Sequence, residues 1–399
     1  RFFDADGDGD LDLYVVSGGN DFAPTEVALT DRLYFNKGNG NFEKSPQALP
    51  IAQRFESTSC VRPADYDQDG DLDLFVGTRL RPLLYGVPVN GYLLENDGKG
   101  FFTEVSKQKA PALEKLGMIT DAIWSDIDRD ADMDLIVVGE WMPITLFKNE
   151  GGRFEKMKQG TGLEQTAGWW NSIAKADLDG DGDEDFIVGN HGLNSRFKAS
   201  VEKPVSCYVN DFDQNRTVEQ IVCTYNGEKA YPLVLRHDMV TQMPQLKKQF
   251  LKYDSYKEKT IEELFAPEVL ERSVVHEVTQ LASVVLLSNG DGTFVLQELP
   301  QAAQFSPVYA ITIGEYTGDD HLDVVLGGNL FGVKPEVGRY DASYGTFLAG
   351  KGDGSFESYT VQKSGIQLEG EVRAIVNVAD KLYIARNNKT MQVFEKGIK

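Results

Sequence analysis

Aspartates recur at every second position of a nine-residue stretch that appears four times in the sequence. The aspartates are Asp4, Asp6, Asp8, Asp10, Asp12, Asp65, Asp67, Asp69, Asp71, Asp73, Asp126, Asp128, Asp130, Asp132, Asp134, Asp177, Asp179, Asp181, Asp183 and Asp185. Carboxylates this close repel one another, so we expect a folded chain to hold them around a cation. Ca²⁺ suits them best because it takes about six to eight oxygen ligands at variable angles.

The spacing differs from that of helix–loop–helix Ca²⁺ sites, which need an acid at position 12. Position 12 holds valine in every copy: Val15, Val76, Val137 and Val188. The last acid falls at position 9 instead, and a short apolar run follows it, so each loop is expected to join two strands. We expect the side chains at positions 1, 3, 5 and 9 and the carbonyl of position 7 to bind the ion. Glycine at position 6 permits a sharp turn, and Ala131 replaces it in the third copy with some strain.

Two further stretches are degenerate copies of the acidic loop. The first keeps oxygen-bearing side chains at the four ligand positions, Asp211, Asp213, Asn215 and Glu219, although Arg216 replaces the glycine. The second, at 315–323, is more eroded. A solvated acidic turn without metal is the alternative for any single copy. The sequence therefore predicts four Ca²⁺ sites and leaves a fifth open.

A second module follows most loops, made of an apolar run, a glycine-rich turn and a phenylalanine. It occurs at 33–42, 93–101, 146–154, 287–294 and 348–356, usually with asparagine before the turn. Loop and module together read as four strands, which is typical of a propeller blade. The sequence predicts an all-β fold, a β-propeller of about seven four-stranded blades in a single domain over 1–399. A solenoid is the alternative, although its repeats are usually shorter.

Blade boundaries follow from the repeats. Regular blades are expected at 1–50, 51–110, 111–163 and 164–225, a fifth is interrupted, a sixth spans 307–361 and a partial seventh spans 370–399. A helical insertion is expected at 236–275, with one to three short helices, because Lys, Glu, Leu and Gln recur there at helical spacing. Glu262 and Glu263 after Thr260 are typical of a helix start. The insertion is read as a packing lid, with partner binding as the alternative.

The first blade is expected to be incomplete, because its first strand contains only Arg1, Phe2 and Phe3. The chain also begins without methionine, so we expect residues upstream of Arg1 and leave further domains there open. The net charge of −22 argues against nucleic-acid binding, which needs lysine and arginine against phosphates. No apolar run reaches the ~18 residues of a membrane span. Ca²⁺ is abundant outside cells, so an extracellular, cell-surface or periplasmic location is expected.

The three cysteines leave one pairing open. Cys207 and Cys223 lie symmetrically about Asn215, so they could face each other across a hairpin as a disulfide. Buried thiols are the alternative. Cys60 is expected in the core.

The acidic loops and the Asn-x-Gly-x-Gly-x-Phe turns resemble FG-GAP/VCBS repeats, found in integrin α-subunit propellers and in large bacterial surface proteins. The resemblance covers nearly the whole chain and implies a Ca²⁺-stabilised propeller, with metal loops on one face and ligand loops usually on the other. Segments 189–196, 304–309 and 338–344 look like those of bacterial VCBS proteins found beside ASPIC/UnbV domains, which are secreted or associated with the outer membrane. The chain departs from the pattern in its short first strand, its insertion and its eroded loops after residue 205.

The face opposite the acidic loops is expected to carry aromatic and polar residues: Arg79, Trp141, Trp169, Trp170, Asn190, His191, Asn194, Arg196, Asn329, Arg339, Tyr340 and Asp341. Flat apolar rings beside directional hydrogen-bonding groups suit a sugar or a peptide. The alternative is that Trp169 and Trp170 plug the ring centre while the arginines pair with acids.

Catalysis has little support from motifs. Gly-x-Ser-x-Gly and His-Glu-x-x-His are absent from the sequence. The sequence favours a non-catalytic, Ca²⁺-stabilised binding or adhesion module outside the cell, with a glycan or protein ligand. One alternative is a Ca²⁺-dependent polysaccharide lyase or hydrolase using His191 with Tyr340 and Arg196 or Arg339. The other is a structural spacer in a larger surface protein.

Overall fold

The expected all-β class is confirmed by the computed structural model, which describes residues 1–395 except 24, 53 and 336. The described residues form seven antiparallel sheets joined by turns and short helices. The predicted last blade ran to residue 399, and its final four residues lie outside the described part.

The first three sheets follow the chain in order. The first contains β1 (Phe2–Phe3), β2 (Asp12–Val15), β3 (Arg32–Asn36) and β4 (Phe42–Lys44), with the 3-10 turn η1 (Val27–Leu29). The second contains β5 (Ser57–Ala64), β6 (Asp73–Leu80), β7 (Gly91–Asn96) and β8 (Phe102–Glu104), followed by α1 (Ser106–Lys109) and η2 (Pro111–Leu113). The third contains β9 (Met118–Ser125), β10 (Asp134–Met142), β11 (Thr145–Asn149) and β12 (Phe154–Lys156), with β13 (Gly168–Trp169) paired to the end of β10.

The fourth sheet is assembled across a long insertion. Its strands are β14 (Ser172–Ala176), β15 (Asp185–Gly189), β20 (Val284–Ser288) and β21 (Phe294–Glu298). The predicted fourth blade at 164–225 is therefore wrong in its outer half, because β15 pairs with β20 rather than with the next strand in sequence. Every residue of β15 is buried, and the Val-Val-Leu run of β20 is buried beside it. Sequence order favoured the wrong partner, and burial on both faces identifies the right one.

Two sheets complete the series. The fifth contains β22 (Val308–Gly314), β23 (Asp323–Gly328), β24 (Thr346–Gly350) and β25 (Phe356–Tyr359), with η4 (Gln301–Gln304) before it and α6 (Val361–Ser364) after it. The sixth contains β26 (Val372–Val378), β27 (Lys381–Arg386) and β28 (Gln392–Glu395). Innermost strands of successive sheets pack together: β5 on β9, β9 on β14, β14 on β22 and β22 on β26.

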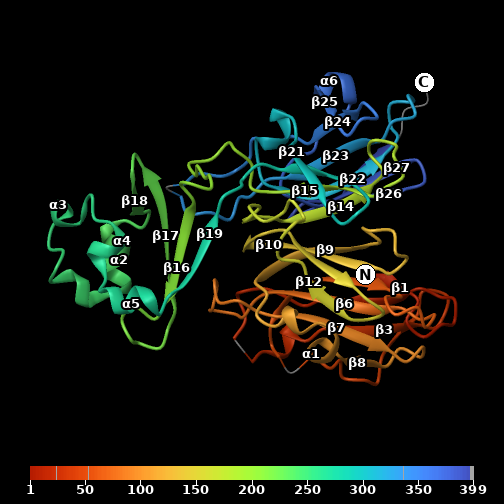
Figure 1. Cartoon of the computed structure of the whole chain (residues 1–399), viewed down its shortest axis with the longest axis horizontal. Coiled ribbons are helices and arrows are strands. Elements are labelled where there is room, and N and C mark those ends of the chain that lie inside the picture. The colour runs from red at the N-terminus through yellow and green to blue at the C-terminus, as the bar shows by residue number, and fades with distance from the viewer. Residues whose placement is uncertain (24, 53, 336, 396–399) are drawn as a thin grey trace.

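The insertion is larger than the predicted 236–275 and contains a sheet of its own. Its strands are β16 (Val205–Asn210), β17 (Glu219–Asn226), β18 (Lys229–Pro232) and β19 (Val274–Val278), and its helical elements are α2 (Arg236–Gln242), η3 (Pro244–Lys247), α3 (Tyr253–Tyr256), α4 (Ile261–Leu264) and α5 (Pro267–Glu271). Figure 1 shows this inserted unit beside the other sheets, with α2–α5 on its far side. Four α-helices exceed the expected one to three. The predicted helix start is confirmed, since Thr260 and Glu263 form a capping box at α4.

The two faces of the inserted sheet pack against different partners. Cys223 packs with helix residues such as Met239, whereas Cys207 packs with Trp141 of β10. Ser206, not Cys207, lies opposite Cys223, so the two cysteines point to opposite faces. All three cysteines are buried and free, which excludes the disulfide.

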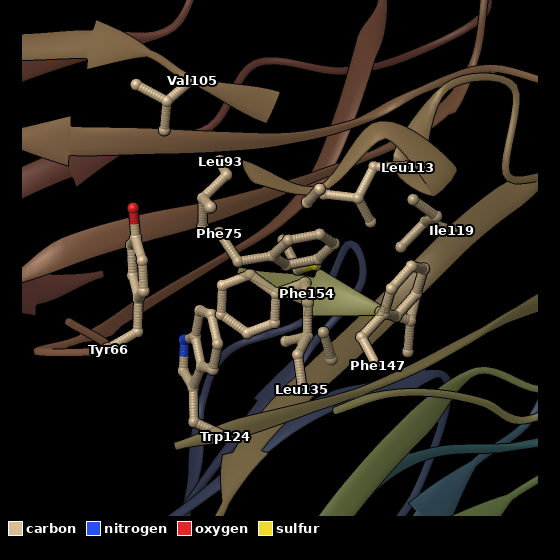
Figure 2. Packing of buried hydrophobic residues seen from close by; sticks show 14 of the residues in the cluster. Tyr66, Phe75, Leu93, Val105, Leu113, Ile119, Trp124, Leu135, Phe147 and Phe154 are labelled. Atoms are coloured by element: carbon tan, nitrogen blue, oxygen red, sulfur yellow. The ribbon is translucent and has the colours of Figure 1, made fainter. Parts of the chain in front are cut away.

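The core lies between facing sheets. In Figure 2, Tyr66 and Phe75 from the second-sheet region meet Trp124 and Phe154 from the third. The rings of Tyr66 and Trp124 stack with centroids 6.0 Å apart and an interplanar angle of 10°. Sheets stacked face to face in chain order make the fold a β-propeller. The predicted count of about seven blades is not confirmed. Six of the described sheets pack in this series, and β16–β19 lies beside them.

None of the described helices has the length and hydropathy that crossing a bilayer requires.

Candidate metal centres and ligand surface

Five groups of carboxylates gather at the predicted loops, each with three ligand atoms within 4.8 Å of one another among the described residues. The groups are Asp4, Asp6 and Asp8; Asp65, Asp67 and Asp69; Asp126, Asp128 and Asp134; Asp177, Asp179 and Asp185; and Asp211, Asp213 and Glu219. Each loop joins two antiparallel strands of one sheet, as β9 and β10 are joined by 126–133. Positions 1 and 3 come together in every group, joined by position 5 in the first two groups and by position 9 in the other three. The expected ligands Asp12, Asp73, Asp130 and Asp181 lie outside the groups.

Several of these carboxylates have a buried oxygen without a hydrogen-bond partner. Asp6, Asp65, Asp67 and Asp128 each have such an Oδ1. Outside the groups, Asp71 Oδ1 and Asp73 Oδ2 are in the same state. A buried anionic oxygen without a donor is costly, and a hard cation bound by several such oxygens removes that cost. The donor set is oxygen only, which suits Ca²⁺ or Mg²⁺ rather than a softer metal.

The acid at position 9 supports the surrounding backbone as well as the loop. Asp134 is fully buried and accepts hydrogen bonds from the amides of Ile127 at 3.2 Å and Asn149 at 2.7 Å. Asp185 accepts in the same way from Leu178 and Ser288. Position 9 therefore joins the start of the loop to the third strand of its sheet.

Burial raises the pKa of these position-9 carboxyls, despite the hydrogen bonds that lower it. The pKa is about 8 for Asp73, about 7 for Asp134 and about 6 for Asp185, and neighbouring aspartates contribute to each rise. A bound divalent cation supplies the positive charge that would keep such groups ionised at neutral pH.

Asparagine before the glycine-rich turn links consecutive loops, a role that the sequence analysis missed. The Nδ2 of Asn96 donates to the carbonyls of Leu72 at 3.2 Å and Ala5 at 2.9 Å, the latter in the loop of the previous sheet. The buried Asn149 repeats this pattern, at 2.8 Å to the carbonyl of Tyr66. The signal in the sequence is the recurrence of asparagine before the turn, which by itself indicates only a turn residue.

The acids at position 7 lie outside the groups and form further links. Gln68 Nε2 donates to a carboxylate oxygen of Asp132 at 2.9 Å, and Arg129 Nε donates to that of Asp183 at 2.5 Å. In each pair, position 4 of one loop reaches position 7 of the next. Asp71 and Asp10 occupy position 7 in the two earlier loops and are likewise outside the groups.

Left-handed backbone appears where glycine was replaced. Ala131 has φ 73° and Arg216 has φ 72°, which agrees with the strain expected at position 6.

Lysines also lie against two of the carboxylate groups. Lys148 Nζ is 2.5 Å from Asp128, and Lys109 Nζ is 3.1 Å from Asp67.

The fifth group lies in the inserted unit, between β16 and β17. Glu219 there is buried and accepts from the amide of Phe212 at 2.9 Å. The predicted ligand Asn215 instead accepts from the amide of Thr217 through its Oδ1, at 2.7 Å. The eroded stretch at 315–323 forms no such group within the described residues.

Several residues expected on the ligand face already use their polar groups in hydrogen bonds within the protein. Trp170 is fully buried, and its Nε1 donates to the carbonyl of Thr166 at 2.8 Å. The buried amides of Asn190 and Asn329 bond to backbone carbonyls. Arg79 forms a two-pronged ion pair with Glu140, at 3.0 and 2.8 Å. Trp170, Asn190 and Asn329 are therefore not available for a ligand as they stand, whereas the paired side chain of Arg79 is still 42% exposed.

Trp141 has a strained backbone and an occupied side chain. Its φ is 60°, rare for a bulky residue, at an irregularity in β10. Its Nε1 donates to Tyr85 Oη at 2.9 Å. Asn194, Arg196, Arg339 and Asp341 are exposed, and the guanidinium of Arg339 lies 5.1 Å from the ring centre of Phe331.

Four rings from separate parts of the chain form what we call the aromatic cluster: Trp169, His191, Phe197 and Tyr340. His191 packs edge-on against Trp169 at 5.0 Å and Tyr340 at 4.7 Å between ring centres. Phe197 packs edge-on against Trp169 at 4.8 Å. Sequence reasoning missed Phe197, which lies in the irregular segment after β15 without a periodic signal.

Three polar atoms of the aromatic cluster are buried without a hydrogen-bond partner in the described structure. They are Trp169 Nε1, His191 Nε2 and Tyr340 Oη. Burial lowers the pKa of His191 to about 4, so its imidazole is neutral at pH 7. The cluster thus encloses three neutral hydrogen-bonding groups among its apolar rings.

Comparison with known proteins supports the repeat assignment. The FG-GAP-like repeat model matches residues 4–76 and 126–188. Each matched stretch runs from one acidic loop to the strand after the next loop. No curated protein matches the chain.

Solved structures similar to the chain have low sequence identity. One is an Agrocybe aegerita lectin that recognises non-reducing terminal N-acetylglucosamine, with 16% identity, a TM-score of 0.35, and coverage of 90% of this chain and 78% of the lectin. A second is the Dos1 propeller, with 10% identity, a TM-score of 0.28, and coverage of 96% and 95%. A third is the V. cholerae biofilm matrix protein Bap1, with 10% identity, a TM-score of 0.27, and coverage of 99% and 86%. The fold is therefore a β-propeller, and two of its stretches, 4–76 and 126–188, are similar to FG-GAP-like repeats.

Proposed function

We propose that this chain is a non-catalytic binding module, stabilised by Ca²⁺ at its acidic loops, that takes a glycan at the aromatic cluster. The observation that carries the proposal is the set of three buried polar atoms without partners on Trp169, His191 and Tyr340. Leaving a buried donor or acceptor unsatisfied costs about 1–3 kcal/mol. Three such atoms within one group of touching rings favour a bound molecule that completes their hydrogen bonds.

The chemistry of these atoms favours a sugar over a charged ligand. Trp169 Nε1 only donates, whereas Tyr340 Oη and the neutral His191 Nε2 can donate or accept, depending on rotamer and tautomer. Hydroxyl groups meet all three requirements because each can donate and accept. The apolar face of a pyranose ring suits an aromatic plate. A protein ligand that presents serine, threonine or tyrosine hydroxyls is the other member of the proposed class.

Ca²⁺ supports this role by holding the loops of consecutive sheets. Each of the five carboxylate groups at the loops would bind its own Ca²⁺ ion. Weak Ca²⁺ modules are filled at the millimolar concentrations found outside cells. We therefore place the protein outside the cytoplasm, at a cell surface, in the periplasm or secreted, where a binding or adhesion role fits.

A glycan array would test the proposal, run with the natural chain and with Trp169→Phe in Ca²⁺ and in EDTA. Trp169→Phe keeps a ring but removes the N–H, so bound glycans should lose about tenfold in affinity, or about 1.4 kcal/mol. Tyr344→Phe is a matched control because Tyr344 is exposed and outside the cluster. Unchanged glycan binding by Trp169→Phe would reject the cluster as the site.

One observation favours a second candidate, a Ca²⁺-dependent lyase or hydrolase. A neutral histidine with a free Nε2 is the state that a general base requires, and His191 has both properties. Product formation from a polysaccharide bound on the array, abolished in His191→Phe, would favour this candidate. Binding without turnover favours the module, and no binding to any glycan favours the structural spacer.

A further inference from the structure

A pocket of about 460 Å³ lies between the fifth and sixth sheets and shares no lining residue with the aromatic cluster or with the five carboxylate groups. It is lined by residues from β24, β25, β27, β28, α6 and the eroded loop at 315–319. Its volume falls within the range of small-molecule sites, about 300–1,000 Å³. None of its lining residues belongs to the surface proposed above to bind a glycan.

One wall of the pocket is aromatic. The rings of Phe347 and Tyr359 stack with centroids 5.5 Å apart and an interplanar angle of 27°. Phe394 and Leu382 extend this apolar wall from the sixth sheet. A wall of this kind is unsuited to a hydrated metal ion but offers π faces to an organic ligand.

The charged residues of the pocket are mainly acidic. Among the described residues, the lining has four acids and one cation: Glu315, Asp319, Asp380 and Glu395, and Lys363. Glu395 is paired with Lys381, at 2.8 Å, outside the lining. With Glu315 and Glu395 left out of the balance, Asp319 and Asp380 still outnumber Lys363 among the described lining residues, so this lining favours positive charge.

The chain already places a cation on the aromatic wall. Lys363 Nζ lies 3.2 Å from the ring centre of Tyr359, while its acidic partner, Glu357, is 4.0 Å away. The Lys363 side chain is 53% exposed, so it can move into solvent without breaking a buried contact. Its ammonium group marks the position where the ring attracts a cation.

We propose that this pocket binds a small organic cation, an alkylammonium or guanidinium group that stacks on Tyr359 in place of the Lys363 ammonium, with the carboxylates of Asp319 and Asp380 nearby. The same chemistry is offered by a free amine and by a lysine or arginine side chain of a protein. Ca²⁺ is the less suitable ligand, because the eroded loop gathers no three-carboxylate group within the described residues.

Calorimetric titration with agmatine at a fixed, saturating Ca²⁺ concentration would test the proposal. Butan-1-ol is the uncharged comparison, and N-acetyl-arginine N-methylamide represents a protein side chain. We expect agmatine to bind and butanol not to bind. Stronger binding of agmatine than of the arginine derivative would indicate a free amine as the source, and the reverse would indicate a side chain.

Two variants make the test specific. Lys363→Met removes the internal competitor and should tighten agmatine binding several-fold, whereas Tyr359→Leu should weaken it about tenfold or more. Thermal melting of both variants in Ca²⁺ controls for folding. The proposal is overturned if agmatine binds neither the natural chain nor Lys363→Met. It is also overturned if agmatine binds Lys363→Met no tighter than the natural chain, or if added Ca²⁺ displaces agmatine. Glycan binding at the aromatic cluster is measured separately, so the two proposals can fail independently.

Discussion

Two loops with the same acid spacing have different surroundings in this molecule. The loop at 126–134 in the third sheet is tied to the loop of the second sheet, through Gln68 to Asp132 at 2.9 Å and through Asn149 to the carbonyl of Tyr66 at 2.8 Å. The loop at 211–219 in the inserted unit makes hydrogen bonds mainly within itself, such as Arg216 N to Asp211 at 2.9 Å. Within the described residues, no hydrogen bond links it to another acidic loop.

The difference indicates that one motif serves two purposes. In the series of six packed sheets, which we call the ring, a cation held by a loop would also fix the carbonyls and carboxylates that reach the neighbouring loop. It would therefore stabilise the contact between sheets. In the inserted unit, a cation would order a single hairpin. Metal affinity and contribution to global stability should therefore differ between the two regions even where the ligands are alike.

Removal of Ca²⁺ should have the largest effect and should act mainly on the ring. At a hundred times Kd, one site contributes about 2.7 kcal/mol, so four ring sites would contribute about 11 kcal/mol to the free energy of unfolding. Calorimetric melting in Ca²⁺ and in EDTA would measure the loss as a large fall in Tm. If the melt is the same in both, the loops do not bind the ion strongly enough to matter.

Loss of a position-9 acid should separate the two regions next. Asp134→Ala leaves two buried amides without an acceptor. This should lower the free energy of unfolding by about 2–5 kcal/mol. Glu219→Ala removes the acceptor of Phe212 and should loosen the inserted unit alone. Hydrogen exchange would show faster exchange across several sheets in the first variant and only over 205–278 in the second. Equal spread of the effect in both variants would contradict the comparison.

The sequence predicted the local features of this fold better than its long-range pairing. The acidic loops, the strands beside them and the helix after Thr260 depend on short spacings, and these predictions agree with the structure. The pairing of β15 with β20 spans almost a hundred residues, and sequence order placed β16 in that position. An inserted sheet has strands as regular as those of a blade, so periodicity alone could not separate them.

The candidate ligand surface was predicted only in part for a similar reason. Residue type identified Trp169, His191 and Tyr340, but it also selected Trp170 and Asn190, whose polar groups are bonded inside the protein. Phe197 joins the cluster from an irregular segment that has no pattern. Whether a polar group is already satisfied depends on tertiary contacts, which spacing in the sequence does not reveal.

The asparagine link between loops should have an intermediate effect. Asn149→Ala removes donation to two carbonyls at a buried position, which we expect to cost about 2 kcal/mol. Asn289→Ala is the matched control, because Asn289 is exposed and its Nδ2 bonds only to Thr293 in its own turn, so the cost should be below ~0.5 kcal/mol. Urea unfolding of both variants in Ca²⁺ would measure the difference. Similar losses would mean that the asparagine acts as a turn residue rather than as a link between sheets.

The smallest effect is expected at the boundary between the two regions, where Trp169 and Phe197 pack both in the aromatic cluster and beside the inserted sheet. Burial lowers the pKa of His191 from 6.5 to about 4. Between these values the unfolded chain binds a proton that the folded chain does not, so stability falls as pH drops below 6.5 and is unaffected by this group above it. From pH 7 to pH 5.5 the loss should be about 1 kcal/mol. His191→Phe should remove this part of the pH dependence while keeping a ring in place. An imidazole NMR signal of His191 that titrates near 6.5 would contradict the burial that the cluster imposes.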